Sequence, residues 1–285
     1  MKIEVQNVSK QFGRTFALDH VSLTLEENRI YGLFGNNGAG KSTLLGLITN
    51  RLYPTEGNIL VDGQPVADND RILGRMFLMG EQNLYPDDMR VVKAFRTAAL
   101  FYPDFNLDLA VDLAHQFGLE TKKKITALST GYASIFRLVI ALSVNTPVLF
   151  LDEPVLGLDA QHRDLFYRLL MKKYAEHPCT ILISTHIMQE ITDMLDHVLI
   201  LRGGRLVKNL PVEDLLAGVY TVSGPTVLMD QYLSTRTPLS VHAVGGLKSA
   251  CLQQVDSKPQ PVEGLTFAPA DLQTYFISLM NEEDA

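Results

Sequence analysis

Apolar and polar residues alternate along the first part of the chain with the period of β-strands. Ile3 to Val8 and Val21 to Leu25 alternate with a period of two, and Ile30 to Phe34 is an unbroken apolar run typical of a buried strand. Asn58 to Val61 predicts a further strand that enters an Asp-Gly turn. Four apolar residues at helical spacing then predict a helix after Lys41, namely Leu44, Leu45, Leu47 and Ile48. The first third of the chain is therefore expected to mix strands and helices.

The period changes between about residues 85 and 143, where apolar residues recur at helical spacing without strand-like alternation. We expect a helical insertion there. Strand patterns then return at Val148 to Leu151, Thr180 to Ser184 and His197 to Leu201, separated by helical stretches at Ala160 to Ala175 and Ile187 to Leu195. Strands alternating with helices of this length predict a mostly parallel sheet covered by helices.

The last 70 or so residues form a separate pattern after a boundary near Asn209 to Leu216. A Gly-Gly pair between two alternating runs predicts a hairpin. The expected order is βαββα, with a strand at Val219 to Ser223, a helix at Thr226 to Ser234 that has Pro225 as its first residue, strands at Leu239 to Val244 and Leu247 to Val255, and a helix at Pro269 to Met280. Residues 217–285 are thus expected to be a small α+β domain.

Composition narrows the class of protein. The 285 residues include 25 Lys and Arg against 32 Asp and Glu, a net charge of −7, so no general positive field attracts a nucleic acid and we expect no such partner. The two cysteines favour a reducing compartment. Met1 to Gln6 shows no targeting pattern, and the longest apolar stretch, Ile135 to Val144, is too short to span a membrane and contains Arg137.

A glycine-rich segment lies between the predicted strand Ile30 to Phe34 and the helix that follows. Residues 35–42 match the phosphate-loop pattern G-x-x-x-x-G-K-[ST]. In such a loop, backbone N–H groups and the helix N-terminus surround phosphate groups, Lys41 reaches the terminal phosphates, and the Ser42 hydroxyl binds Mg²⁺. The loop is therefore expected to bind phosphate groups together with Mg²⁺.

Two carboxylates end the predicted strand Val148 to Leu151. Asp152 falls where a Mg²⁺ ligand must lie to face a phosphate loop at the same edge of a parallel sheet. Glu153 can then orient or deprotonate the attacking water. A strand ending in Asp-Glu is commonplace by itself, and its position downstream of a phosphate loop is what gives it meaning.

Over residues 1–208 the chain resembles the ATP-binding cassette (ABC) ATPase family, in the order and spacing of its motifs. Leu128-Ser129-Thr130-Gly131-Tyr132 occupies the place of the Leu-Ser-Gly-Gly-Gln signature, and Gly157-Leu158-Asp159 is similar to the D-loop. His186 matches the switch histidine, and Phe12 lies where the family places an aromatic residue against adenine. The resemblance implies a P-loop NTPase fold: a RecA-like core with an antiparallel β subdomain and an inserted helical subdomain at about 85–143, followed by the small C-terminal α+β domain.

The resemblance also implies a head-to-tail dimer in which each ATP lies between the phosphate loop of one subunit and the signature of the other. It assigns catalysis to Glu153, His186, Gln82 and Lys41, and Mg²⁺ binding to Ser42, Gln82 and Asp152. The implied ATP-binding residues are Phe12, Gly35, Asn36, Asn37, Gly38, Ala39, Gly40, Lys41, Ser42, Thr43, Ser129, Thr130, Gly131, Tyr132 and Asp159.

The chain departs from the family pattern in three places. In the signature, Thr130 replaces a glycine and Tyr132 replaces the glutamine, so the contact with ATP across the dimer is expected to be weaker or reshaped. In the glutamine loop, Gln82 is our choice, and Glu81 fits the spacing almost as well. Val155 stands near the D-loop where Thr or Ser is common.

The expected function is that of the ATP-binding and ATP-hydrolysing subunit of an ABC transporter. It would lie on the cytoplasmic, inner face of the cell membrane, paired with a second ATP-binding subunit as a homodimer or heterodimer. Separate membrane-spanning subunits would dock near Glu81 to Asp88. The signature Thr130, the stretch Tyr102 to Phe105 and the C-terminal domain resemble bacterial exporters linked to antibiotic or peptide resistance. Two alternatives remain: a soluble ABC ATPase outside transport, and an ATP-binding regulatory subunit with little hydrolysis.

Overall fold

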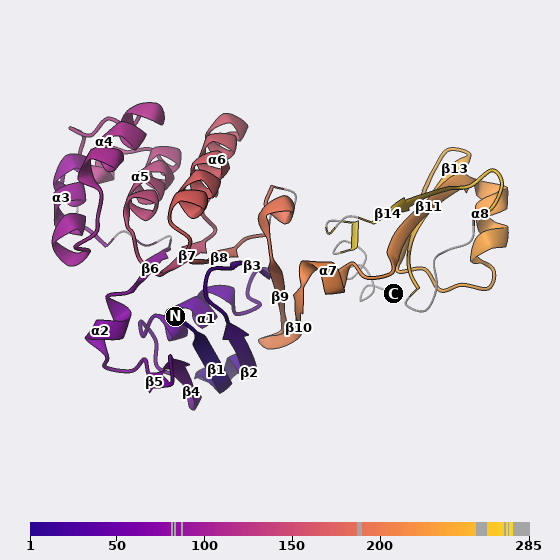
Figure 1. Cartoon of the computed structure of the whole chain (residues 1–285), viewed down its shortest axis with the longest axis horizontal. Coiled ribbons are helices and arrows are strands. Elements are labelled where there is room, and N and C mark those ends of the chain that lie inside the picture. The colour runs from indigo at the N-terminus through magenta and orange to yellow at the C-terminus, as the bar shows by residue number, and fades with distance from the viewer. Residues whose placement is uncertain are drawn as a thin grey trace. The chain divides into compact units, whose positions relative to one another are not determined.

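The computed structural model describes residues 1–80, 82, 84–86, 88–186, 190–254, 261–270, 272 and 274–275. The chain divides into two compact units (Figure 1). Unit 1 comprises Met1–Ile187 and Asp193–Asn209, and unit 2 comprises Met188–Thr192 and Leu210–Ala285. In the described part of the chain, no helix is both long enough and apolar enough to cross a bilayer.

An antiparallel sheet forms one layer of unit 1. Its strands lie in the order β2-β1-β4-β5 and span Ile3–Phe12 (β1), Thr15–Leu25 (β2), Glu56–Val61 (β4) and Gln64–Pro65 (β5). The predicted Asp-Gly turn follows β4, with Asp62 and Gly63 both at positive φ. Strands β1 and β2 are longer than the alternating runs predicted, because they continue into a hairpin that pairs Phe12 with Thr15.

The second layer is a six-stranded sheet in the order β10-β9-β3-β8-β7-β6. Its strands are Ile30–Phe34 (β3), Met76–Met79 (β6), Val148–Asp152 (β7), Thr180–Ser184 (β8), His197–Arg202 (β9) and Arg205–Pro211 (β10). Strands β9, β3, β8, β7 and β6 run parallel, so their carboxyl ends share one edge. The two units divide between Asn209 and Leu210, within the boundary expected at residues 209–216, but the sequence did not predict strand β10. The Gly203-Gly204 pair, both residues at positive φ, connects β9 directly to it.

The core of unit 1 fills the space between the two sheets, and helix α1 (Lys41–Ile48) contacts both β2 and β7. Buried side chains from both sheets and from α1 form one cluster, which includes Ile3, Leu33, Leu44, Phe150 and Leu199. These are the positions at which the strand and helix periods placed apolar residues. The phosphate loop therefore leads into a helix that is buried at the centre of the unit.

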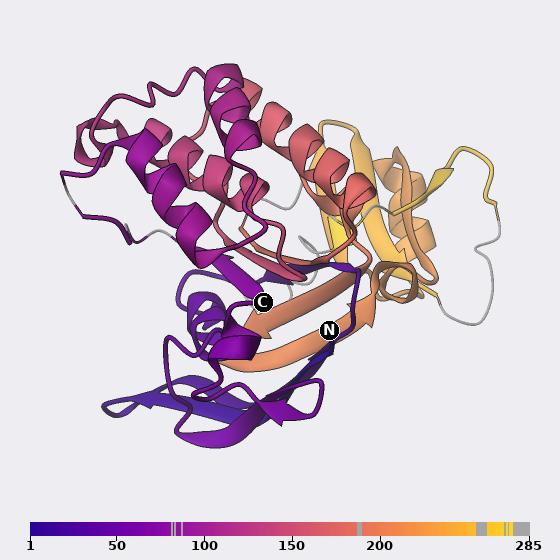
Figure 2. The ribbon, with the colours of Figure 1, turned by 60° about the vertical axis from the view of Figure 1, so that its left-hand side comes forward.

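The other helices of unit 1 gather on the side away from the antiparallel sheet (Figures 1 and 2). They are α3 (Val91–Phe101), α4 (Leu107–Gln116), the 3₁₀ helix η1 (Ile125–Ala127), α5 (Thr130–Ser143) and α6 (Ala160–Glu176). The short α2 (Asp70–Leu73), between β5 and β6 in the chain, lies apart from this group, and its Ile72 packs in the core with residues of the antiparallel sheet. The sequence predicted the start of α5 at Ser134. The helix begins four residues earlier because Ser129 caps it, its Oγ accepting a hydrogen bond from the Tyr132 N–H at 3.4 Å.

The helix predicted over residues 187–195 is not found in the part that the structure describes. Residues 190–195 contain only the 3₁₀ helix η2 (Thr192–Met194), and residues 187–189 lie outside the described ones. Ile191, Thr192 and Asp193 all have modest helix propensity, which outweighs the apolar spacing on which the prediction rested.

Unit 2 has an antiparallel sheet in the order β12-β13-β11-β14. Its elements are α7 (Val212–Leu215), β11 (Val219–Pro225), α8 (Thr226–Leu233), β12 (Ser240–Val244), β13 (Leu247–Gln253) and β14 (Thr266–Pro269). Helix α8 covers one face, where Tyr220, Val222, Met229, Tyr232, Ala250 and Leu252 form the core. The hairpin at Gly245-Gly246 is confirmed.

Three details of unit 2 differ from the sequence prediction. Pro225 ends β11 and caps α8 instead of being its first residue. Strand β14 was missed because it has only four residues and ends in a proline. Pro269 therefore belongs to a strand, and Ala270 is not helical. Of the rest of the predicted helix the structure describes Leu272, Thr274 and Tyr275, which are helical.

Candidate functional site

The phosphate loop connects β3 to α1 and depends on glycine at Gly40. This residue is the N-cap of α1 at φ 105°, in the left-handed region that favours glycine. A Cβ atom there would come within 2.5 Å of the Ala17 carbonyl oxygen and 2.6 Å of Leu18 Cδ2. The loop thus packs directly against strand β2, and no side chain fits between them.

Lys41 follows at the first position of α1 and is only 7% exposed. Its Nζ donates to the Gly35 carbonyl at 2.7 Å and lies 3.9 Å from Glu153 Oε1. Asn36, Asn37, Gly38 and Ser42 are exposed around it. The ammonium group therefore points into a loop whose outer residues face solvent, as a lysine that meets phosphates must.

Asp152 ends strand β7 beside Ser184 of β8. Its Oδ1 is buried without a hydrogen-bond partner among the described residues, and the same holds for Ser184 Oγ. Burying a carboxylate oxygen without a partner costs free energy unless a cation or a hydrogen-bond donor binds to it. The site suits Mg²⁺, which is usually held by one or two carboxylates together with substrate phosphates and water. Sequence reasoning missed Ser184, whose only signal is a polar residue ending an apolar strand.

Glu153 follows Asp152 with a positive φ of 46°, which is uncommon for a residue other than glycine. Its backbone N–H donates to the Ser184 carbonyl at 2.8 Å, which fixes the turn. The carboxylate is 15% exposed, and its Oε2 lies 2.9 Å from Nδ1 of His186. The structure thus brings Lys41, Asp152, Glu153 and His186 together, because β3, β7 and β8 end at one edge of the sheet.

The signature segment begins helix α5 and contacts the D-loop segment. The Ser134 hydroxyl donates to the Leu156 carbonyl at 2.9 Å. The position of a Cβ on Gly131 lies 3.0 Å from the Gly157 carbonyl oxygen, so glycine is also the residue that fits there. Contacts of this kind hold the exposed start of α5, with Ser129, Thr130 and Gly131, against residues 156–157.

Asp159 has a structural role within the chain, as the cap of a helix. Asp159 caps helix α6, accepting from the His162 N–H at 2.9 Å and lying 2.8 Å from the His162 ring through its other oxygen. The hydrogen bond from the His162 backbone, followed by that from its ring, lowers the pKa of Asp159. Tyr132 is 39% exposed in the first turn of α5. A contact of either residue with ATP stays a prediction.

Phe12 lies at the end of β1 with half of its surface exposed, and the ammonium of Lys10 lies 5.1 Å from the centre of its ring. The ring is therefore available for stacking. Gln82 is exposed, and Glu81, the other choice for the glutamine-loop position, lies outside the described residues.

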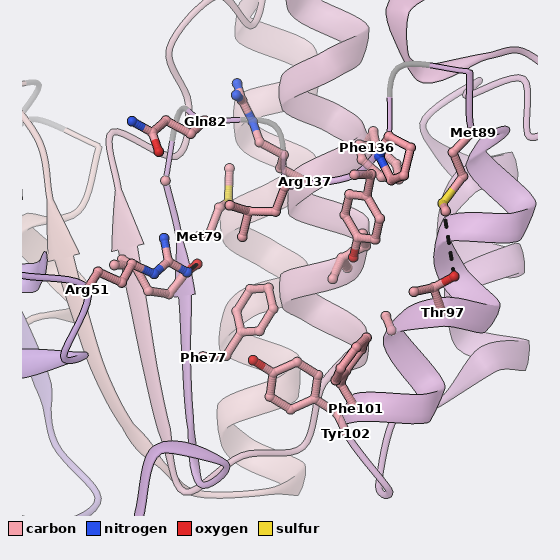
Figure 3. Close-up of a pocket in the computed structure, with 17 residues that line it drawn as sticks. Arg51, Phe77, Met79, Gln82, Met89, Thr97, Phe101, Tyr102, Phe136 and Arg137 are labelled. Carbon is pink, nitrogen blue, oxygen red and sulfur yellow. Dashed lines mark hydrogen bonds between the residues drawn. The ribbon is translucent and has the colours of Figure 1, made fainter. Parts of the chain in front are cut away.

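A cavity of about 520 Å³ lies beside Gln82, between β6 and the helices α3 and α5 (Figure 3). Most of its wall is apolar or aromatic, with Phe77, Met79, Tyr85, Met89, Phe101, Tyr102 and Phe136 among the lining residues. Tyr85 packs edge-on against Phe136 at 5.5 Å, and burial raises the pKa of its phenol to about 12. Sequence reasoning placed a groove here but missed Arg51, which donates to the Leu78 carbonyl at 3.0 Å.

Many known proteins are similar to this chain, including the following three relatives. The ABC transporter ATP-binding protein YtrB of Bacillus subtilis is 30% identical over 213 residues, covering 75% of this chain and 73% of YtrB. The bacitracin transport ATP-binding protein BcrA of Bacillus licheniformis is 29% identical over 225 residues, covering 75% and 71%. The ribose import ATP-binding protein RbsA 2 of Rhizobium meliloti is 30% identical over 224 residues, covering 75% of this chain and 44% of that protein.

Solved structures share the fold. An ATP-binding subunit of an ABC transporter superposes with a TM-score of 0.69 at 24% identity, over 75% of this chain and 92% of that one. A dimeric post-hydrolysis state of an ATP-binding cassette with ADP and Pi gives 0.64 at 22% identity, over 73% and 98%. The P-loop NTPase fold expected from the motifs is thereby confirmed. Residues 18–156 also match the ABC transporter family model. The chain belongs to the ABC transporter family, as an ATP-binding subunit whose cassette is an ATPase.

Proposed function

We propose that ATP is hydrolysed at the edge where β3, β7 and β8 end, with Glu153 as the base that orients and deprotonates water. The observation that carries this proposal is the arrangement of the Glu153 carboxylate, with one oxygen 2.9 Å from His186 and the other 3.9 Å from Lys41. A carboxylate held between a phosphate-binding ammonium and an imidazole can polarise water next to the terminal phosphate.

The remaining residues bind and orient the nucleotide. Lys41 and the loop N–H groups neutralise and position the phosphates. His186 positions Glu153 next to the terminal phosphate, and Phe12 stacks on adenine. Ser42, Asp152 and Gln82 would hold Mg²⁺, which neutralises phosphate charge when it is bound.

We assign the signature residues Ser129 to Tyr132 to the ATP of a second ATP-binding subunit in a head-to-tail dimer. Ser129 already caps α5, so the start of that helix presents further N–H groups to solvent, and a helix N-terminus favours an anion. Dimeric structures of related cassettes support this assembly. The contacts of α5 with residues 156–157 would transmit closure of the dimer to the D-loop.

The apolar cavity beside Gln82 would receive a cytoplasmic helix from a membrane-spanning subunit. Its aromatic wall and the exposed Phe101 suit an apolar helix face. The ATPase would then lie on the inner face of the membrane and drive transport by ATP-dependent dimer closure. Export is our choice of direction, on the similarity to BcrA, whose name assigns it to bacitracin transport, although ribose and tungstate import proteins also match.

Glu153→Gln tests the catalytic proposal. Turnover should fall by about 10²–10⁴-fold, because the base is lost while the phosphate loop stays intact. ATP affinity should change little, and ATP should stabilise a dimer in gel filtration. Glu120→Gln, which removes an exposed carboxylate paired with Lys123, is the matched control and should retain full turnover. Wild-type turnover in the Glu153 variant would refute the assignment.

Phe101→Glu tests the docking surface. It places a charge at the rim of the cavity and should prevent co-purification with the membrane subunits while ATP turnover of the isolated chain is unchanged. Val111→Glu, on the exposed side of α4, is the control. Equal recovery of the membrane subunits with both variants would exclude the cavity as the docking surface.

A further inference from the structure

The sheet of unit 2 ends on a strand with an unusually open edge. β12 (Ser240–Val244) has a single neighbour among the described strands, β13. Its sequence, Ser-Val-His-Ala-Val, contains no Lys, Glu, Asp, Arg, Pro or Gly. Val241 and Val244 are 43% and 81% exposed. Edge strands usually carry charges, prolines or bulges that prevent pairing with another chain, and β12 has none of these devices.

The opposite edge of the same sheet is different. β14 (Thr266–Pro269) has four residues and ends in a proline, a residue that lacks the N–H needed to continue a ladder. The ladder between β12 and β13 runs through five regular register pairs without a bulge. The open edge at β12 can therefore pair with a further strand over its whole length, and the edge at β14 cannot.

The hairpin fixes which backbone groups of β12 point outward. Val244 pairs with Leu247 across the two-residue turn Gly245-Gly246. In such a hairpin the residues next to the turn exchange hydrogen bonds, and alternate residues do the same along the strand. The N–H and C=O groups of Val244 and His242 are thus directed to β13, and those of Val241 and Ala243 to the open edge.

We propose that β12 pairs antiparallel with β12 of a second copy of this chain, about a two-fold axis through His242. In this register Val241 lies opposite Ala243 of the second copy, and the reverse, so the outward groups of the two strands form four hydrogen bonds with each other. The two sheets become one continuous sheet. The interface is self-complementary, as an interface on a two-fold axis must be.

The side chains of β12 favour a second copy over an unrelated strand. No charges oppose each other in the paired strands, and the exposed valines pack against small or β-branched neighbours. The inference rests on the proposed function in one respect. The ATP-dependent dimer would bring two copies of unit 2 into one complex. This raises the effective concentration of one β12 edge near the β12 edge of the second copy.

Cysteine cross-linking in the full-length chain tests the register. The two His242 residues would form a non-hydrogen-bonded pair with Cα atoms about 4.5 Å apart, within the range of a disulfide. His242→Cys should therefore give a covalent dimer under mild oxidation. Val244→Cys is the matched control on the same strand, because two Val244 positions would lie about 14 Å apart. The wild-type chain shows whether the native cysteines, Cys179 and Cys251, which are both buried, form cross-links by themselves.

A charge variant tests the same pairing without a cross-link. His242→Lys would place two ammonium groups opposite each other and should weaken dimerisation by about tenfold in sedimentation, whereas His242→Thr should not. Circular dichroism checks that both variants fold. Gln231→Lys adds the same charge on the exposed face of α8 and should leave dimerisation unchanged.

Each measurement is made without nucleotide and with ATP in a Glu153→Gln background. A cross-link through His242→Cys in either state, with none through Val244→Cys, supports the pairing. If ATP produces a dimer but His242→Cys does not cross-link in it, the edge pairing is refuted and the cassette dimer stands. If the cross-link forms while ATP produces no further association, the edge pairing stands and the cassette dimer fails. Equal cross-linking at both positions, capture of another protein's strand, or no dimer in any state refutes the pairing.

Discussion

Gly40→Ala offers the sharpest test of how the phosphate loop is built. The new methyl group would meet the Ala17 carbonyl oxygen at 2.5 Å, and this oxygen belongs to the backbone of strand β2, between the paired residues Phe16 and Leu18. The residue would also be held at φ 105°, which costs an L-residue about 1–2 kcal/mol. Overpacking adds about 1–3 kcal/mol, and the stiffer unfolded chain returns about 0.4–1 kcal/mol. The net loss in the free energy of unfolding is thus about 1–4.6 kcal/mol.

Gly38→Ala is the matched control within the same loop. Gly38 also has a positive φ, of 82°, but a Cβ there has no atom within 4 Å. The conformational cost applies without the overpacking, so the loss should be about 0–1.6 kcal/mol. Urea unfolding of both variants without nucleotide measures the difference, and fluorescent ATP analogues measure binding. If Gly40→Ala were no less stable than Gly38→Ala, the close packing of the loop on β2 would not be a constraint on its sequence.

Three further predictions concern ATP affinity, alkaline stability and helix capping. Lys41→Ala should weaken ATP binding by about 10–100-fold in calorimetry, because charge-assisted hydrogen bonds to the phosphates are lost, and unchanged affinity would contradict the role given to Lys41. The pKa of Tyr85 is raised to about 12 by burial, so the folded chain keeps a proton that the unfolded chain releases near pH 10. The free energy of unfolding of the wild type should therefore fall by about 2–3 kcal/mol more than that of Tyr85→Phe between pH 10 and pH 12, and the buried phenol contributes its full stabilisation below pH 10. If the free energies of unfolding of the two proteins changed in parallel with pH, this prediction would be refuted. Asn106 caps α4 by accepting from the Leu109 N–H at 2.9 Å, so Asn106→Ala should lower the free energy of unfolding by about 1 kcal/mol without changing ATP turnover, and an unchanged urea midpoint would show that the cap contributes nothing.

The strands that hold the site could be predicted from the sequence almost to the residue. Ile30 to Phe34 and Thr180 to Ser184 coincide with β3 and β8, because a buried parallel strand needs a continuous apolar run that ends where polar residues begin. The elements that were missed lack this pattern. β14 is too short to show a period, and β10 alternates only weakly beyond its glycine turn.

The sequence predicted which residues form the site better than it predicted their geometry. The positive φ of Glu153 could not be predicted, because nothing local in the sequence requires it. The hydrogen bond from its N–H to the Ser184 carbonyl, where β7 lies beside β8, imposes that conformation. The start of α5 was misplaced for a similar reason. Thr130 and Gly131 are weak helix formers, and tertiary contacts of the signature with residues 156–157 together with the Ser129 cap extend the helix over them.

The charge of the chain illustrates why composition says little about this ligand. A net charge of −7 does not favour a polyanion, yet charges farther away than about 8 Å are screened at physiological salt. What ATP meets is Lys41, whose ammonium is held by the neutral carbonyl oxygen of Gly35 at 2.7 Å. A phosphate group is anionic, so its oxygens bind an ammonium more strongly than a neutral carbonyl oxygen does. Lys41 is buried, its nearest partner is this neutral carbonyl, and the Glu153 carboxylate lies farther away at 3.9 Å. Exchange of the carbonyl for a phosphate therefore favours the nucleotide whatever the total charge of the chain.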